Sequence, residues 1–249
     1  MIRFAIYAGL ADMEASIRRT ILGPLWSTLG LAFLVACLSL FFGSVLKQVL
    51  PDYPEYTALL ASGLIAWTFM ASCVHQSCNL VWSFLNTLRH NRMTLVVPVV
   101  RVMLRNFVIL LLNISLALII AWLYFGRLAV TPLALLGGIL LLVLNTFWIS
   151  YVAALASARF RDLPQLIAWG LHLAFFLTPI LWIEDNLPRH GYLIDINPFA
   201  SLIALLRHPL LGLPVTAEIW LGASLIGLLG LLLARWLGRH AAHRLPYWL

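Results

Sequence analysis

The sequence predicts an all-helical (all-α) integral membrane protein. It is expected to have six transmembrane helices, an N-terminal interfacial helix and short external re-entrant helices between spans five and six. Of the 249 residues, 63% are hydrophobic and only 10% are charged, whereas soluble domains are about 45–50% apolar and about 25% charged. Six apolar runs are each long enough to cross a bilayer. Positive charges gather between alternate runs, as is typical of a cytoplasmic side.

The apolar runs place one transmembrane domain over the whole chain, 1–249. They cover residues 27–50, 57–84, 99–123, 132–157, 163–183 and 215–235. Lys47, Arg101 and Arg105 lie near the ends of runs, where long side chains can reach the interface. The composition excludes a soluble enzyme, a disordered chain and a disulfide scaffold.

The distribution of charge predicts that both termini are cytoplasmic. Twelve of the 16 lysines and arginines fall in the N-terminal segment, the 85–98 loop, the 158–162 loop, the C-terminal segment and the adjoining span ends. Short loops rich in arginine stay on the cytoplasmic side of the membrane. The net charge of +7 therefore reports orientation, and no nucleic-acid partner is expected.

The first 22 residues are expected to form a helix in the cytoplasmic interface. They do not resemble a signal peptide, because charges interrupt the segment and there is no long apolar region. Their apolar side chains recur every three or four residues, at Ile2, Ile6, Leu10, Met13 and Ile17. Such a stripe favours a helix lying in the interface. A short cytoplasmic helix packed on the first span would show the same stripe.

Residues 184–214 are expected to form external helices. Prolines interrupt this segment, and the eight apolar residues at 199–206 are too few to span a bilayer. Because Pro198 and Pro209 bound this stretch, it is predicted to be one short helix. It would be re-entrant or interfacial, and a plain external loop is the alternative.

The chain lacks the motifs of an enzyme or an ion-coupled carrier. Its single lysine, Lys47, is not part of a P-loop, so any ATP hydrolysis must occur in another polypeptide. Glu184-Asp185 is the only adjacent acid pair and is interpreted as a loop cap. His240 and His243 lie in a basic tail, so no metal site is expected. The spans carry no central carboxylate for ion coupling.

Polar and aromatic side chains predict a substrate pathway. One face of the second span carries them at spacings of three and four, as Thr68, Ser72, His75, Asn79, Trp82 and Asn86. Such a face avoids lipid, so it either bonds neighbouring helices or lines a wet conduit. The conduit would suit a polar, weakly charged substrate such as a sugar chain. Shorter stripes add Gln165, Trp169, His172 and Phe176 on the fifth span, and Asn145, Trp148 and Tyr151 on the fourth.

The 85–98 loop is the cytoplasmic segment best suited to contact a partner. It is basic and polar at its start, apolar later, and ends at Pro98. These features predict a short amphipathic helix that projects toward a cytosolic protein. Charge that serves only to orient the membrane protein explains the arginines equally well.

Several short motifs together resemble the type-2 ABC exporter permeases for polysaccharides, which export O-antigen, capsule and teichoic acid. The resemblance covers nearly the whole chain. Its motifs are Arg18-Arg19 and LGPLW at 22–26, GLIAW at 63–67, Pro98, RFRD at 159–162, Pro179 and Asn197-Pro198.

The resemblance implies an ATP-driven permease for a lipid-linked polysaccharide in the bacterial inner membrane. It implies a homodimer with a channel at its interface and two separate ABC ATPase subunits, which would hold ATP and Mg²⁺. The coupling segment would comprise Thr87, Leu88, Arg89, His90, Asn91, Arg92 and Met93. Arg18 and Arg19 would meet the lipid pyrophosphate. The external gate would include Asn197, Pro198 and Phe199.

Two other functions fit the sequence less well. An integral-membrane enzyme of lipid or glycan assembly would need a cluster of catalytic groups, for which Glu184-Asp185 is the only candidate. An ABC permease for a small lipid or drug would share most of the motifs. The polar and aromatic faces favour a glycan over a small lipid or drug.

Overall fold

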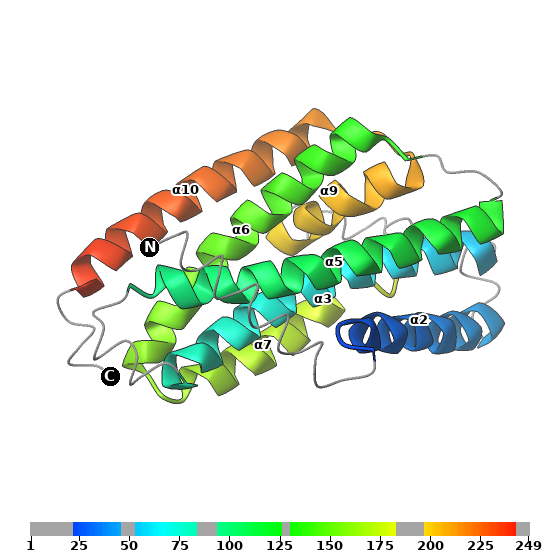
Figure 1. Ribbon diagram of the computed structural model, residues 1–249. Coiled ribbons are helices and arrows are strands. Elements are labelled where there is room, and N and C mark those ends of the chain that lie inside the picture. The colour runs from blue at the N-terminus through cyan, green and yellow to red at the C-terminus, as the bar shows by residue number, and fades with distance from the viewer. Residues whose placement is uncertain (1–21, 46–52, 84–93, 126–129, 183–196, 243–249) are drawn as a thin grey trace.

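The computed structural model describes residues 22–45, 53–83, 94–125, 130–182 and 197–242. In these ranges the chain forms an all-helical bundle (Figure 1). The helices are α2 (Leu25–Val45), α3 (Tyr53–Ser83), α5 (Val96–Phe125), α6 (Pro132–Arg159), α7 (Leu163–Leu177), α9 (Pro198–Leu211) and α10 (Ala217–Ala242).

Helix α3 is the centre of the bundle. It packs against α2, α5, α6, α7 and α9, and 78% of its segment Tyr56–Leu80 is buried, against at most 28% in each other long helix. Figure 1 shows α6, α9 and α10 on one side of α3 and α5, with α2 and α7 on the other. The polar stripe predicted on the second span therefore lies on the best-packed helix of the described chain.

Five helices of the described residues are long and apolar enough to cross a membrane. They are α2, α3, α5, α6 and α10, and they fall in five of the six predicted runs. Their outward faces carry exposed large apolar residues, such as Phe33 and Leu133. Contact of such apolar faces with lipid is favourable, whereas their exposure to water is unfavourable.

The fifth predicted run, 163–183, differs from the prediction. Helix α7 has only 15 residues and ends at Leu177. At a rise of about 1.5 Å per residue it is about 22 Å long, which is shorter than a hydrocarbon core of about 30 Å. The chain turns away at Thr178 and Pro179, because proline provides no backbone N–H to continue the helix.

Helix α9 forms where the prolines predicted a short helix, and it extends to Leu211. The Asn197 side chain caps it by accepting a hydrogen bond from the Phe199 N–H at 3.0 Å. Gly212 ends it in the left-handed conformation, with φ of 73°, which glycine adopts without steric cost. Pro209 lies inside its last turn, so the boundary predicted there is wrong.

The α6, α9 and α10 layer is held by close contacts at glycines. A Cβ placed on Gly138 of α6 would collide with the Leu205 carbonyl oxygen of α9. On α10, a Cβ on Gly230 would collide with the Trp148 indole, and one on Gly238 would lie 2.5 Å from the Tyr151 hydroxyl. Small residues let membrane helices approach closely enough for extensive van der Waals contact.

Candidate functional site

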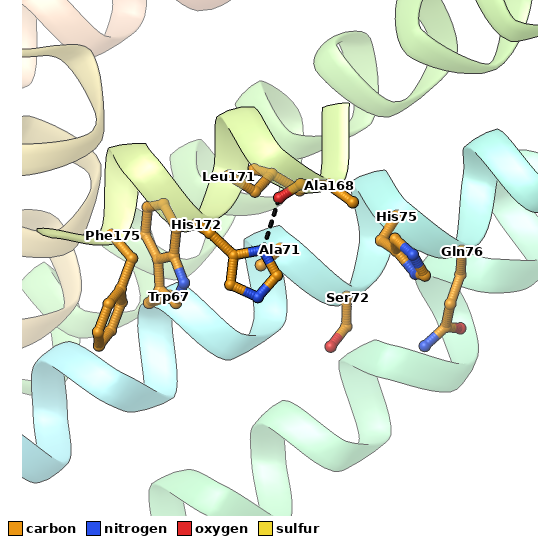
Figure 2. Close-up of a pocket in the computed structure, with 9 residues that line it drawn as sticks. All are labelled: Trp67, Ala71, Ser72, His75, Gln76, Ala168, Leu171, His172 and Phe175. Carbon is orange, nitrogen blue, oxygen red and sulfur yellow. Dashed lines mark hydrogen bonds between the residues drawn. The ribbon is translucent and has the colours of Figure 1, made fainter. Parts of the chain in front are cut away.

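A cavity of about 340 Å³ lies between α3 and α7. Its walls combine polar side chains with aromatic rings (Figure 2). They are formed by Trp67, Ala71, Ser72, His75, Gln76, Ala168, Leu171, His172 and Phe175. Among the residues that the structure describes, no carboxylate, lysine or arginine lines this cavity, so it suits a neutral polar ligand.

The α7 side of the cavity presents an oriented histidine. The His172 Nδ1 lies 2.7 Å from the Ala168 carbonyl oxygen, as the dashed line in Figure 2 shows. Because a carbonyl oxygen only accepts, Nδ1 carries the proton of this bond and Nε2 of the neutral ring is an acceptor. The exposed Trp169 ring lies 6.1 Å from the imidazole. The pair offers a hydrogen-bonding edge beside a flat apolar face.

The α3 side carries the described members of the predicted polar stripe. Ser72 and His75 line the cavity, and the Asn79 Nδ2 lies 3.4 Å from the His75 Nε2. Thr68 and Ser72 also line a second cavity, between α2, α3 and α5. The structure thus brings Ser72, His75 and His172 to one cavity and leaves Thr68 beside it. Gln76, which was not predicted, lines both cavities.

An aromatic cluster at the Trp67 end joins the cavity to α9. The Trp67 ring lies 5.7 Å from Phe175 of α7 and 5.6 Å from Phe199 of α9. Phe199 was predicted to belong to the external gate, whereas Trp67 and Phe175 were not assigned to the site. Trp67 is the last residue of the GLIAW motif, so its place in that motif was the available signal.

The non-helical backbone after α7 is fastened by side chains from several elements. We call this segment, residues 178–182, the α7 break. Its carbonyl groups and those of the last α7 turn accept hydrogen bonds from Thr178, Trp182, Asn197, Arg207 and Tyr56. The Arg207 Nη2 donates to the Pro179 oxygen at 2.9 Å, and the Tyr56 hydroxyl to the Leu181 oxygen at 3.0 Å. Irregular backbone at membrane depth needs such internal partners.

Asn197 connects the α7 break to α9. Its Oδ1 caps α9, while its Nδ2 donates to the Thr178 hydroxyl at 3.0 Å and lies 3.4 Å from the Leu177 oxygen. Pro198 is the first residue of the helix, where a missing N–H does no harm. The predicted gate residues therefore join the end of α7 to the start of α9.

Trp148 and Tyr151 lie away from the cavity, in the α6–α10 contact. The Trp148 Nε1 donates to the Asn145 Oδ1 at 3.1 Å, and the Asn145 Nδ2 donates to the Ala223 oxygen of α10 at 3.1 Å. The Tyr151 ring stacks on Phe147 at 6.4 Å and its hydroxyl faces Gly238. In this fold both aromatics pack one helix against another.

Other predicted residues lie outside the part of the chain whose side chains are described. They are Arg18, Arg19, Trp82, Asn86, Thr87, Leu88, Arg89, His90, Asn91, Arg92 and Met93. Most of the predicted interfacial helix at 1–22, most of the 85–98 loop and the 184–196 segment also lie outside the described residues.

The long apolar helices beside an open polar and aromatic cavity define a multi-pass membrane protein. No protein-family model matches the chain. The chain is 29% identical over 202 residues to the O-antigen export system permease protein RfbA of Klebsiella pneumoniae, covering 77% of this chain and 74% of the relative. It is 28% identical over 200 residues to the protein of the same name from Myxococcus xanthus, with the same coverage. The resemblance to type-2 ABC exporter permeases of the polysaccharide family is confirmed.

Proposed function

We propose that the chain is the transmembrane subunit of an ATP-driven exporter for a lipid-linked polysaccharide. The similarity to O-antigen export permeases over 77% of the chain carries this proposal. The cavity between α3 and α7, whose described lining has no carboxylate, lysine or arginine, supports it. Sugars bind through hydrogen bonds to hydroxyls, amides and imidazoles and through contact with aromatic faces. The side chains of this cavity supply all of these groups.

The proposed assembly is a homodimer in the bacterial inner membrane with two ABC ATPase subunits. ATP and Mg²⁺ belong to the ATPase subunits, since this sequence has no P-loop. The segment from Thr87 to Met93 contacts the ATPase, and Arg18 and Arg19 meet the pyrophosphate of the lipid carrier. Both termini are cytoplasmic.

In the proposed cycle, ATP-driven closure of the ATPase subunits pushes on the coupling segment and the start of α2. This movement opens the route along the polar face of α3, where Ser72 and His75 face His172 across the cavity. Hydrogen bonds to these side chains hold each sugar weakly enough for the polysaccharide to advance. The link through Asn197 transmits movement between α7 and α9 at the external end.

The proposal is tested by deleting the gene and complementing it with wild type or variants. Export predicts that the deletion strain loses surface polysaccharide and accumulates lipid-linked polymer inside the cell. An intact surface polysaccharide without internal accumulation would contradict the proposal. Co-purification of an ATPase whose activity depends on this chain tests the energy source separately.

A further inference from the structure

A second cavity, of about 330 Å³, lies between α2, α3 and α5. Its polar lining includes Ser27, Ser72, Gln76, Arg105, Asn106 and Asn113. The remaining wall is largely apolar and includes Leu31 and Leu34. It differs from the α3–α7 cavity in carrying a cation.

Arg105 is the charged group of this cavity. It lies nine residues after Val96, the start of α5, and therefore about 14 Å along the helix. An arginine within a membrane span is costly unless a partner or water stabilises it. Among the residues that the structure describes, Arg105 has no hydrogen bond or ion pair. The cavity thus presents a guanidinium without a protein counter-charge in that part of the chain.

Neutral amides stand beside this cation. The Asn106 Nδ2 donates to the Gln76 Oε1 at 3.1 Å, and the Gln76 Nε2 lies 3.4 Å from the Asn106 Oδ1. This pair fixes the wall next to Arg105 without neutralising its charge.

Asn113 lies two helical turns further along α5 on the same face as Arg105. It is 4% exposed, and its Oδ1 has no hydrogen-bond partner within the described ranges. An unsatisfied buried amide costs about 1–3 kcal/mol. A molecule bound in the cavity could form the hydrogen bond that the Asn113 side-chain amide lacks, after a rotation of that amide.

We propose that this cavity binds the phosphorylated headgroup of a membrane lipid. Arg105 pairs with the phosphate, because a guanidinium binds phosphate oxygens through two parallel hydrogen bonds. Ser72 and Asn113 bind polar groups of the head, and Leu31 and Leu34 contact the start of the lipid chain. An exposed arginine near the end of an apolar span, where it can reach the interface, and a partly apolar wall favour a lipid headgroup over a soluble anion. This site goes beyond the proposed transport activity and binds without ATP.

The test uses the purified full-length chain in a neutral, phosphate-free detergent. Thermal unfolding is followed with phosphatidylglycerol, a polyprenyl phosphate, diacylglycerol or inorganic pyrophosphate added. The phosphate-headed lipids should raise the Tm, and diacylglycerol and pyrophosphate should not. An equal shift with diacylglycerol would overturn the phosphate assignment, and an equal shift with pyrophosphate would overturn the lipid assignment.

Two variants locate the site. Arg105→Gln should weaken binding of the phosphate-headed lipids about tenfold or more, as expected from losing a charged hydrogen-bonded pair. Arg101→Gln is the matched control, since Arg101 lies one turn away on α5 and does not line the cavity. Equal loss in both variants, or full binding by Arg105→Gln, would overturn the proposal. If Arg105→Gln fails to fold, Asn113→Leu should still reduce the lipid-induced shift, and an unchanged shift would overturn it.

Discussion

Gly138 of α6 lies directly against the backbone carbonyl of Leu205 of α9, with no room between them for a side chain. Pro209 is four residues after Leu205 and has no N–H, so the Leu205 oxygen lacks its usual helical partner. The proline that frees this carbonyl lies on α9, and the glycine that leaves room for the carbonyl lies on α6. The carbonyl freed on α9 faces the only residue type that could approach it so closely.

Replacing Gly138 with alanine should separate α6 from α9. The new Cβ would meet backbone atoms, which cannot rotate away, and overpacking of this kind costs about 1–3 kcal/mol. Thermal unfolding of the purified chain should show a lower Tm. Gly222→Ala is the matched control, because its Cβ meets nothing within 4 Å, and it should be neutral or slightly stabilising. Equal losses in both variants would contradict the contact.

Replacing Asn197 separates its two roles. Asn197→Ala should cost about 0.5–2 kcal/mol from the lost cap of α9, and more from the lost bond to Thr178. Asn197→Asp keeps the oxygen that caps α9 but removes the donor to Thr178. Asn197→Asp should therefore fall between wild type and Asn197→Ala in thermal stability. Identical stabilities for the two variants would show that only one of the bonds matters.

Arg207→Met should loosen the α7 break. It leaves the Pro179 oxygen without its charged donor, and such hydrogen bonds contribute about 1.5–3 kcal/mol. Protease cleavage near the α7 break should increase, and the Tm should fall. Arg239→Met, on the exposed end of α10, is the control and should behave as wild type. Wild-type protease resistance in Arg207→Met would exclude the fastening role.

His172→Leu should reduce polysaccharide export while the protein stays folded. It removes one hydrogen-bonding edge from the α3–α7 cavity, which corresponds to about fivefold at about 1 kcal/mol. Surface polysaccharide per molecule of membrane-inserted protein is the measurement. Leu173→Ala changes a neighbour that does not line the cavity and should export normally. Unchanged export in His172→Leu would remove this residue from the pathway.

Trp148→Ala should lower stability with little effect on export, which is the opposite of the result expected for His172→Leu. The indole fills the space over Gly230, so truncation should cost about 3 kcal/mol in stability. Export per folded molecule should change little, because Trp148 faces α10 in this fold. A large export defect at normal stability would place Trp148 in the pathway after all.

Apolar runs predicted six spans, because lipid demands continuous apolar length, and five of these runs coincide with long apolar helices. Helix α10 continues seven residues beyond the predicted end at residue 235. The prediction overestimated α7 because apolar residues continue to Trp182, although Pro179 was visible as the residue that ends the helix. The side chains that fasten the break, Tyr56 and Arg207, are distant in sequence and could not be predicted. Spacing correctly placed Ser72 and His75 on one face of α3. It could not distinguish the aromatic faces of α7 and α6, because both show the same period. Only the glycines of α10 reveal that Trp148 packs against a helix.

If α7 lies in the bilayer, as the proposed exporter requires, its short length lowers the barrier that the membrane presents beside it. A helix of about 22 Å leaves roughly a quarter of a 30 Å hydrocarbon layer unmatched. A bilayer can adapt to a hydrophobic segment that is too short by becoming locally thinner. Dielectric repulsion of a polar solute grows with the thickness of hydrocarbon it must cross. In the proposed export route, a sugar that follows α7 from His172 toward the α7 break would cross the membrane where the hydrocarbon layer is thinnest.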